Sequence, residues 1–88
     1  MGLDIVELFI EVEKRFCIEI PNEEAQEAST VGQLFEIVLD KLQKLDPEHP
    51  PDREQVWWRL KNLIVDYQGL RSEEVQPGAS FVEDLHMD

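Results

Sequence analysis

The chain has 88 residues, which is enough for one small domain. A domain of this size buries only about 60% of the surface that its unfolded chain exposes. Twenty acidic against eight basic residues give a formal charge of -12, which argues against nucleic-acid binding because a phosphate backbone needs clustered cations. Basic partner surfaces are the natural complement, although a general acidic excess also serves solubility alone. The single Cys17 excludes an intrachain disulfide, and its apolar neighbours Phe16 and Ile18 predict a small core residue in a reducing compartment.

The sequence carries no sign of membrane targeting. No charged-then-apolar signal region opens it, and no apolar run approaches the roughly 20 residues of a membrane span. We therefore expect a soluble, cytoplasmic protein without membrane insertion.

The first predicted element is a helix from Leu3 to Phe16. Its apolar face follows a three-or-four spacing and consists of Ile5, Leu8, Phe9, Val12 and Phe16. A second, flanking apolar stripe consists of Leu3, Val6 and Ile10. The helix is therefore expected to contact neighbours on more than one side.

Acidic residues share a further face of this helix, at intervals of three and four: Asp4, Glu7 and Glu11. One interpretation is a solvated face on which Glu11 and Arg15 form an i,i+4 ion pair. The other is a face that docks a partner. Both interpretations are open at this point.

An irregular connection with one helical turn is expected over 17–29, because Pro21 and Asn22 interrupt any longer helix. Thr30 then begins a second helix, since its hydroxyl and the Gln33 side chain can form a capping box. Lys41 and Lys44 suit the negative end of its dipole. The apolar stripe of this helix consists of Val31, Leu34, Phe35, Val38 and Leu42.

Three prolines in the segment 46–52 (DPEHPPD) predict an extended linker that reaches at most about 25 Å. Asp52 is a good N-cap for a third helix, which Gly69 would end. Trp58 falls at the edge of its apolar stripe, either partly exposed or covering the linker. The stripe itself consists of Val56, Trp57, Leu60, Leu63, Ile64 and Tyr67.

The remaining segment is expected to be mostly irregular. Ser72 would cap one short turn, and Pro77 and Gly78 mark another turn. We expect its apolar residues Phe81, Val82 and Leu85 to anchor the tail on the core.

Two long segments resemble the acyl carrier protein family, but in swapped order. Residues 60–85 (LKNLIVDYQGLRSEEVQPGASFVEDL) are similar to the family's first helix and long loop. Residues 2–38 (GLDIVELFIEVEKRFCIEIPNEEAQEASTVGQLFEIV) are similar to its second, third and fourth helices. Joined tail to head, FVEDLHMD and GLDIVELFIEVEKRF match the family pattern FVEDLxxDSLDxVELxxxxExxF, except that Gly2 replaces the serine.

The resemblance implies an all-α fold: a small acyl-carrier-protein-like helical bundle of three main helices plus short turns, with circularly permuted connectivity. Residues 1–88 would form one domain, in which 2–45 resemble the family's C-terminal part, 46–52 are the linker and 53–88 resemble its N-terminal part. A cut at an exposed loop tip with a new linker between neighbouring old ends keeps every core contact. We favour a monomer over a swapped homodimer, in which 81–88 of one subunit would complete the other.

In the family, the serine carries the phosphopantetheine arm at a helix N-terminus, where amide donors and the dipole favour negative charge. Gly2 keeps that cofactor-binding position but has no hydroxyl, so no cofactor is expected. The serines that are present, Ser29, Ser72 and Ser80, have local roles. If Met1 were removed, the free amine of Gly2 could act as a nucleophile, but we favour an ordinary chain end.

Other chemical sites are not indicated. His86 and Asp88, with Glu83 and Asp84, lack a second histidine or cysteine at ligand spacing, so no metal site is predicted. The sequence contains neither a recognisable nucleophile–base pair nor a nucleotide-binding loop, so we do not expect an enzyme.

The resemblance therefore implies a non-enzymatic protein that docks basic surfaces of acyl-chain enzymes, of the fatty-acid or polyketide type, through Asp4, Glu7, Glu11 and Glu13. Lys14 and Arg15 replace acids that are frequent in the family. One alternative is a functional carrier that bears phosphopantetheine on another residue or uses the serine of a partner chain. Another is an interaction module unrelated to acyl chemistry.

Overall fold

A computed structural model describes residues 3–81 and 83–85, with side chains from residue 5 onward. Within these residues the regular structure is entirely helical. The elements in chain order are α1 (Leu3–Phe16), α2 (Asn22–Glu27), α3 (Val31–Leu45), α4 (Arg53–Gln68) and the 3-10 helix η1 (Ser72–Glu74). The predicted small bundle of three main helices is confirmed, and the connection between the first two contains the short helix α2.

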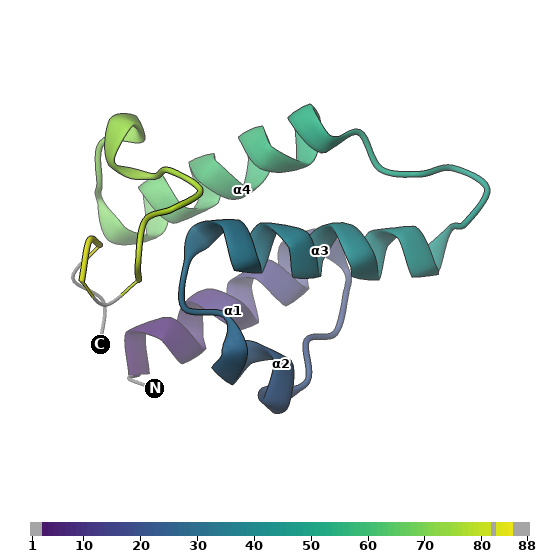
Figure 1. The fold of residues 1–88 in the computed structure, drawn as a ribbon, viewed down its shortest axis with the longest axis horizontal. Helices are drawn as coiled ribbons and strands as arrows, with labels where there is room; N and C mark the ends of the chain where they lie inside the picture. The colour runs from purple at the N-terminus through teal and green to yellow at the C-terminus, as the bar shows by residue number, and fades with distance from the viewer. Residues whose placement is uncertain (1–2, 82, 86–88) are drawn as a thin grey trace.

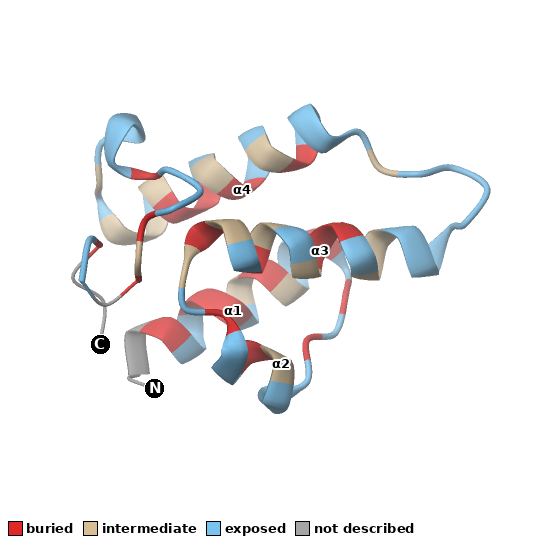
Figure 2. Ribbon diagram, in the orientation of Figure 1, coloured by how far each residue is buried: buried red, intermediate tan, exposed pale blue. Residues whose placement is uncertain are grey.

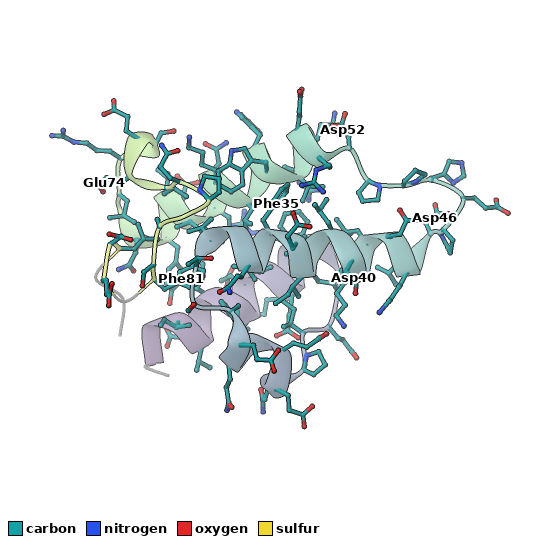
Figure 3. The ribbon with its side chains drawn as sticks, viewed as in Figure 1. Phe35, Asp40, Asp46, Asp52, Glu74 and Phe81 are labelled. Atoms are coloured by element: carbon teal, nitrogen blue, oxygen red, sulfur yellow. The ribbon has the colours of Figure 1, made fainter. Side chains whose placement is uncertain are left out.

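Helices α3 and α4 lie side by side and are joined at one end of the molecule by the connection 46–52 (Figure 1). They run antiparallel, because Phe35 packs its ring 5.3 Å from the ring of Trp57 while Glu36 accepts a hydrogen bond of 2.9 Å from Arg53. Figure 3 shows Phe35 between the two helices. The proline-rich linker therefore closes a helical hairpin, as its short reach requires.

Helix α1 also runs antiparallel to α4. Near the start of α1, the Glu7 carboxylate accepts a hydrogen bond of 2.9 Å from the Tyr67 hydroxyl, near the end of α4. Near the end of α1, the Arg15 carbonyl accepts one of 3.2 Å from Arg59, in the first half of α4. These contacts place the two ends of α1 against opposite ends of α4.

The core lies between the three long helices, where their buried faces meet (Figure 2). Every buried side chain among the described residues is apolar, so the core contains no ion pair that would carry a desolvation cost. The largest fully buried side chains are Phe81, Leu8, Leu34, Leu60, Ile64 and Leu85.

The predicted helix signals are confirmed at α3 and α4. Thr30 Oγ1 accepts from the Gln33 amide at 3.3 Å, and Gln33 Oε1 accepts from the Thr30 amide at 3.1 Å, which completes the capping box. Asp52 Oδ1 accepts from the Glu54 amide at 3.0 Å at the start of α4. Gly69 ends that helix in the left-handed region, with φ of 67°.

The expected core position of Cys17 is wrong. Cys17 is exposed and has φ of 55°, the left-handed conformation that commonly follows the end of a helix. The left-handed residue reverses the chain after α1, so that the Ile18 amide donates to the Glu13 carbonyl at 3.1 Å. Ile18 and Ile20 then enter the core in place of the thiol.

The predicted capping role of Ser72 is also wrong. Ser72 is the first residue of η1, and Arg71 occupies the N-cap position. The Arg71 amide donates to Glu74 Oε2 at 3.4 Å, so the turn is closed by a carboxylate two residues further along than the serine.

The tail docks on the beginning of α3. The Gly32 amide donates to the Pro77 carbonyl at 2.7 Å, the Val31 amide donates to Ala79 at 3.0 Å, and the Phe81 amide donates to Ser29 at 3.1 Å. The amides at the start of α3 therefore find partners in the tail. Phe81 and Leu85 are buried as predicted, whereas Val82 lies outside the described residues.

Candidate functional site

The position of the family's serine in the resemblance, Gly2, lies outside the described residues, and so does the side chain of Asp4. The description of α1 begins at Leu3, beside this position.

An open groove of about 510 Å³ lies beside the start of α1. It is lined by residues from α1, from the end of α2 and from the tail: Ile5, Ala25, Gln26, Ala28, Ser29, Ser80 and Phe81. Phe81 also packs against Phe9, with ring centroids 5.9 Å apart. Segments from the two ends of the described chain thus meet at the beginning of α1.

The two serines in this groove already have local hydrogen-bond partners. Ser29 Oγ donates to Gln33 Oε1 at 2.9 Å, next to the capping box. Ser80 Oγ accepts from the Glu83 amide at 3.2 Å, and the Ser80 amide donates to Asp84 Oδ2 at 2.7 Å. Both serines therefore act in the local backbone structure, as the sequence predicts.

The acids of α1 fall on two sides of the helix. At about 100° per residue, Glu7 and Glu11 lie one turn apart on the side that contacts α4. Glu7 is bonded to Tyr67, and Glu11 pairs with Arg15 at 3.8 Å. This ion pair was one interpretation of the acidic face, but it is a long contact between an exposed Arg15 and a partly exposed Glu11, so it contributes little to stability.

Glu13 is not brought together with Glu7 and Glu11. Its carboxylate accepts a hydrogen bond of 3.1 Å from the Ile20 amide, which ties the connection after α1 back to the helix. Glu13 is partly buried, and it borders a groove toward α2.

An exposed apolar strip lies between these two sets of acids. Val6 is 40% exposed and Ile10 is 42% exposed, one helical turn apart. Both residues border a groove shared with Ala25 and Gln26 of α2, so the expectation that the helix contacts neighbours on more than one side agrees with its contacts to α4 and its groove with α2. The sequence showed the i,i+4 spacing of this strip, but its exposure depends on how α2 packs.

No group of three or more potential metal-ligating side chains occurs among the described residues. His49 forms an exposed pair with Asp46 in the connection 46–52. Figure 3 labels Asp46 and Asp52, the two ends of this connection. His86 lies outside the described part of the chain. None of the described helices is both long enough and apolar enough to span a membrane.

Comparison with known proteins gives matches to acyl carrier proteins. The chain is 47% identical over 37 residues to that of Wolinella succinogenes, which covers 42% of this chain and 49% of the relative. For Chlorobium phaeobacteroides the values are 44% over 40 residues, 46% of this chain and 51% of the relative. The acyl carrier protein of Amoebophilus asiaticus is 48% identical over 41 residues, which cover 47% of this chain and 51% of the relative.

The chain therefore spans about half the length of the curated relatives it matches. No family model matches it, and no solved structure gives a significant match. The described residues form a small helical bundle, and the sequence is similar to acyl carrier proteins over about half of their length.

Proposed function

We propose that this protein is a non-enzymatic, acyl-carrier-like protein that docks basic surfaces of acyl-chain enzymes through α1. The observation that carries the proposal is the exposed strip of Val6 and Ile10, which has Glu7 and Glu11 on one side and Glu13 on the other. Apolar contact supplies binding energy, while the flanking acids orient a basic partner. Asp4 belongs to the same proposed face by its spacing.

The three acids contribute unequally in this proposal. Glu7 and Glu11 are exposed or half-exposed on one side of the helix, and their present partners are weak surface contacts. Glu13 is already engaged by the Ile20 amide, so its carboxylate has less freedom to meet a partner. Glu7 and Glu11 therefore lead the docking face.

We further propose that the order of the two halves is swapped relative to the family, within one domain of residues 1–88. An alignment that keeps the residues of both chains in the same order can match only one of two swapped halves. Matches over about half the relatives' length are therefore consistent with the swapped order. The packing of Phe81 on Phe9 and the hairpin closed by the connection 46–52 support the same arrangement. A monomer is the proposed state.

The protein is also proposed not to carry phosphopantetheine. Gly2 offers no hydroxyl at the position where the family has its serine. Ser29 and Ser80 are the serines near the start of α1, and both are used in local hydrogen bonds. The acidic docking face would then act without a bound arm.

The docking role is tested by the substitution Glu7→Lys, with binding to purified ketoacyl synthases and acyltransferases measured by surface plasmon resonance. Reversing the charge places a cation against the basic partner, so we expect affinity to fall by about tenfold or more. The matched control is Glu48→Lys, which makes the same charge change in the exposed linker and should leave affinity unchanged. Equal affinity for Glu7→Lys and the unsubstituted chain would contradict the docking proposal.

A further inference from the structure

A hydrogen bond from α4 reaches the acid that leads the proposed docking face of α1. The Tyr67 hydroxyl, near the end of α4, donates to Glu7 Oε2 at 2.9 Å, and the two residues are 60 positions apart in the sequence. Their side chains differ in burial, because Glu7 is exposed whereas Tyr67 is partly buried. A group anchored in the bundle thus holds an exposed acid.

The position of the Tyr67 hydroxyl is set by α4 and the core. Tyr67 follows the buried residues Leu63 and Ile64 by one helical turn, and its ring packs against the hydrophobic core. The last turn of α4 is closed directly after it, where the Gly69 amide donates to the Val65 carbonyl at 2.8 Å. Because a tyrosine side chain has few rotatable bonds, its hydroxyl is presented to α1 from a rigid support.

Two effects oppose a fixed position of the Glu7 carboxylate. Glutamate is among the side chains with the largest rotamer entropy, which an exposed position preserves. Glu7 also lies one turn before Glu11, and like charges at this spacing repel each other. Glu11 contacts Arg15 at 3.8 Å, one turn further along the helix. The hydrogen bond from Tyr67 counteracts both effects at Glu7.

The same hydrogen bond leaves Glu7 able to meet a partner. The phenol donates one proton to one oxygen, and a carboxylate has further acceptor positions on both of its oxygens. Because Glu7 is exposed, a cation of a partner can reach those positions. An ion pair that starts from an ordered carboxylate loses less side-chain entropy on binding, so the contact with Tyr67 favours docking.

We propose that Tyr67 is a positioning residue, which orients Glu7 for a cation of a basic partner. This inference rests on the proposed function of α1, in which Glu7 leads the docking face. Tyr67 acts through the Glu7 carboxylate and not through a contact of its own with the partner. Helix α4, which lies outside the proposed docking face, thereby contributes to docking.

The first test is the side-chain conformation of Glu7 in the free chain, measured by three-bond scalar couplings in nuclear magnetic resonance. The unsubstituted chain should show the couplings of one preferred conformation. Tyr67→Phe removes the hydroxyl and keeps the ring, so the Glu7 couplings should shift toward the averages of several rotamers. Identical couplings in both chains would overturn the proposal, whatever the affinity for a partner.

The second test is a double-mutant cycle of Tyr67→Phe and Glu7→Ala, with binding to a purified ketoacyl synthase measured by surface plasmon resonance. We expect Tyr67→Phe alone to weaken binding about threefold, the size expected for the ordering of one long side chain. In the Glu7→Ala background the same change should have no effect, because the carboxylate through which Tyr67 acts is absent. An equal loss in both backgrounds would mean that Tyr67 acts on helix packing, which contradicts the proposal.

A control in the same helix is Asn62→Ala, which removes a side-chain hydrogen bond of 2.8 Å to the Trp58 carbonyl and touches no acid of α1. Its affinity for the synthase should equal that of the unsubstituted chain, and a loss as large as that of Tyr67→Phe would overturn the proposal. If Glu7→Ala weakens binding and Tyr67→Phe does not, the docking face stands and the positioning role is overturned. If Glu7→Ala has no effect, the docking face and the positioning role both fail.

Discussion

Replacing Phe81 by alanine is expected to lower the free energy of unfolding by about 3–5 kcal/mol. Phe81 is only 1% exposed, and its ring packs edge-on against Phe9. The substitution removes a large buried side chain and leaves a cavity between the tail and α1. Urea denaturation followed by circular dichroism measures the loss, which is large for a domain of this size.

The control for Phe81→Ala is Trp58→Ala, which also truncates an aromatic side chain. Trp58 is 67% exposed, so its loss should change the free energy of unfolding by no more than about 0.5 kcal/mol. Similar small changes in both variants would show that the tail is not packed on the core. That result would remove the structural basis for joining the two segments around the start of α1.

Replacing Gly32 by alanine is expected to destabilise the protein by about 1–3 kcal/mol, even though alanine favours a helix over glycine by about 1 kcal/mol. A Cβ at Gly32 would stand 2.7 Å from the Pro77 carbonyl oxygen. The clash falls on backbone, so the tail must shift and the hydrogen bond between the Gly32 amide and Pro77 must weaken. Thermal unfolding monitored by calorimetry shows whether the variant is less stable or more stable than the unsubstituted chain.

The matched control is Gly78→Ala, in the same contact region. No atom lies within 4 Å of the Cβ that alanine would add at Gly78, so the change should be neutral or slightly stabilising. If Gly32→Ala is instead more stable than the unsubstituted chain, helix propensity dominates and the close approach of the tail to α3 is wrong.

Sequence patterns predicted the parts of this fold that depend on neighbours along the chain. The capping box of Thr30 and Gln33, the N-cap at Asp52 and the end of α4 at Gly69 each involve residues within a single helical turn. Hydrophobic spacing similarly predicted the inward faces of the three long helices. Local chemistry therefore accounts for most of the secondary structure.

The errors concern contacts between distant segments and the choice of a cap. The apolar neighbours of Cys17 indicated a core position, but the chain must reverse after α1, and the residue that reverses it becomes exposed. Ser72 has the residue type of a cap, but Arg71 takes the N-cap position of the turn. The exposure of Cys17 depends on tertiary packing, which spacing alone does not specify.

The same difference between local patterns and contacts of distant segments applies to the candidate site. The acids of α1 were found from their spacing, but the hydrogen bond between Glu13 and the Ile20 amide separates that residue from Glu7. The Arg59 contacts with α1 join residues more than forty positions apart, and no local pattern indicates them. The sequence thus indicated which helix carries the proposed docking face, while the contacts of its side chains with distant segments are visible only in the structure.

A modification assay tests whether this carrier-like scaffold lacks the phosphopantetheine arm of the family. The full chain is incubated with coenzyme A and a broad phosphopantetheinyl transferase, beside a conventional acyl carrier protein that has the serine, and intact masses are recorded. We predict that the conventional carrier gains one phosphopantetheine group while this chain keeps its mass. A stoichiometric phosphopantetheine adduct on this chain, mapped to any residue, would contradict the claim and favour a functional carrier.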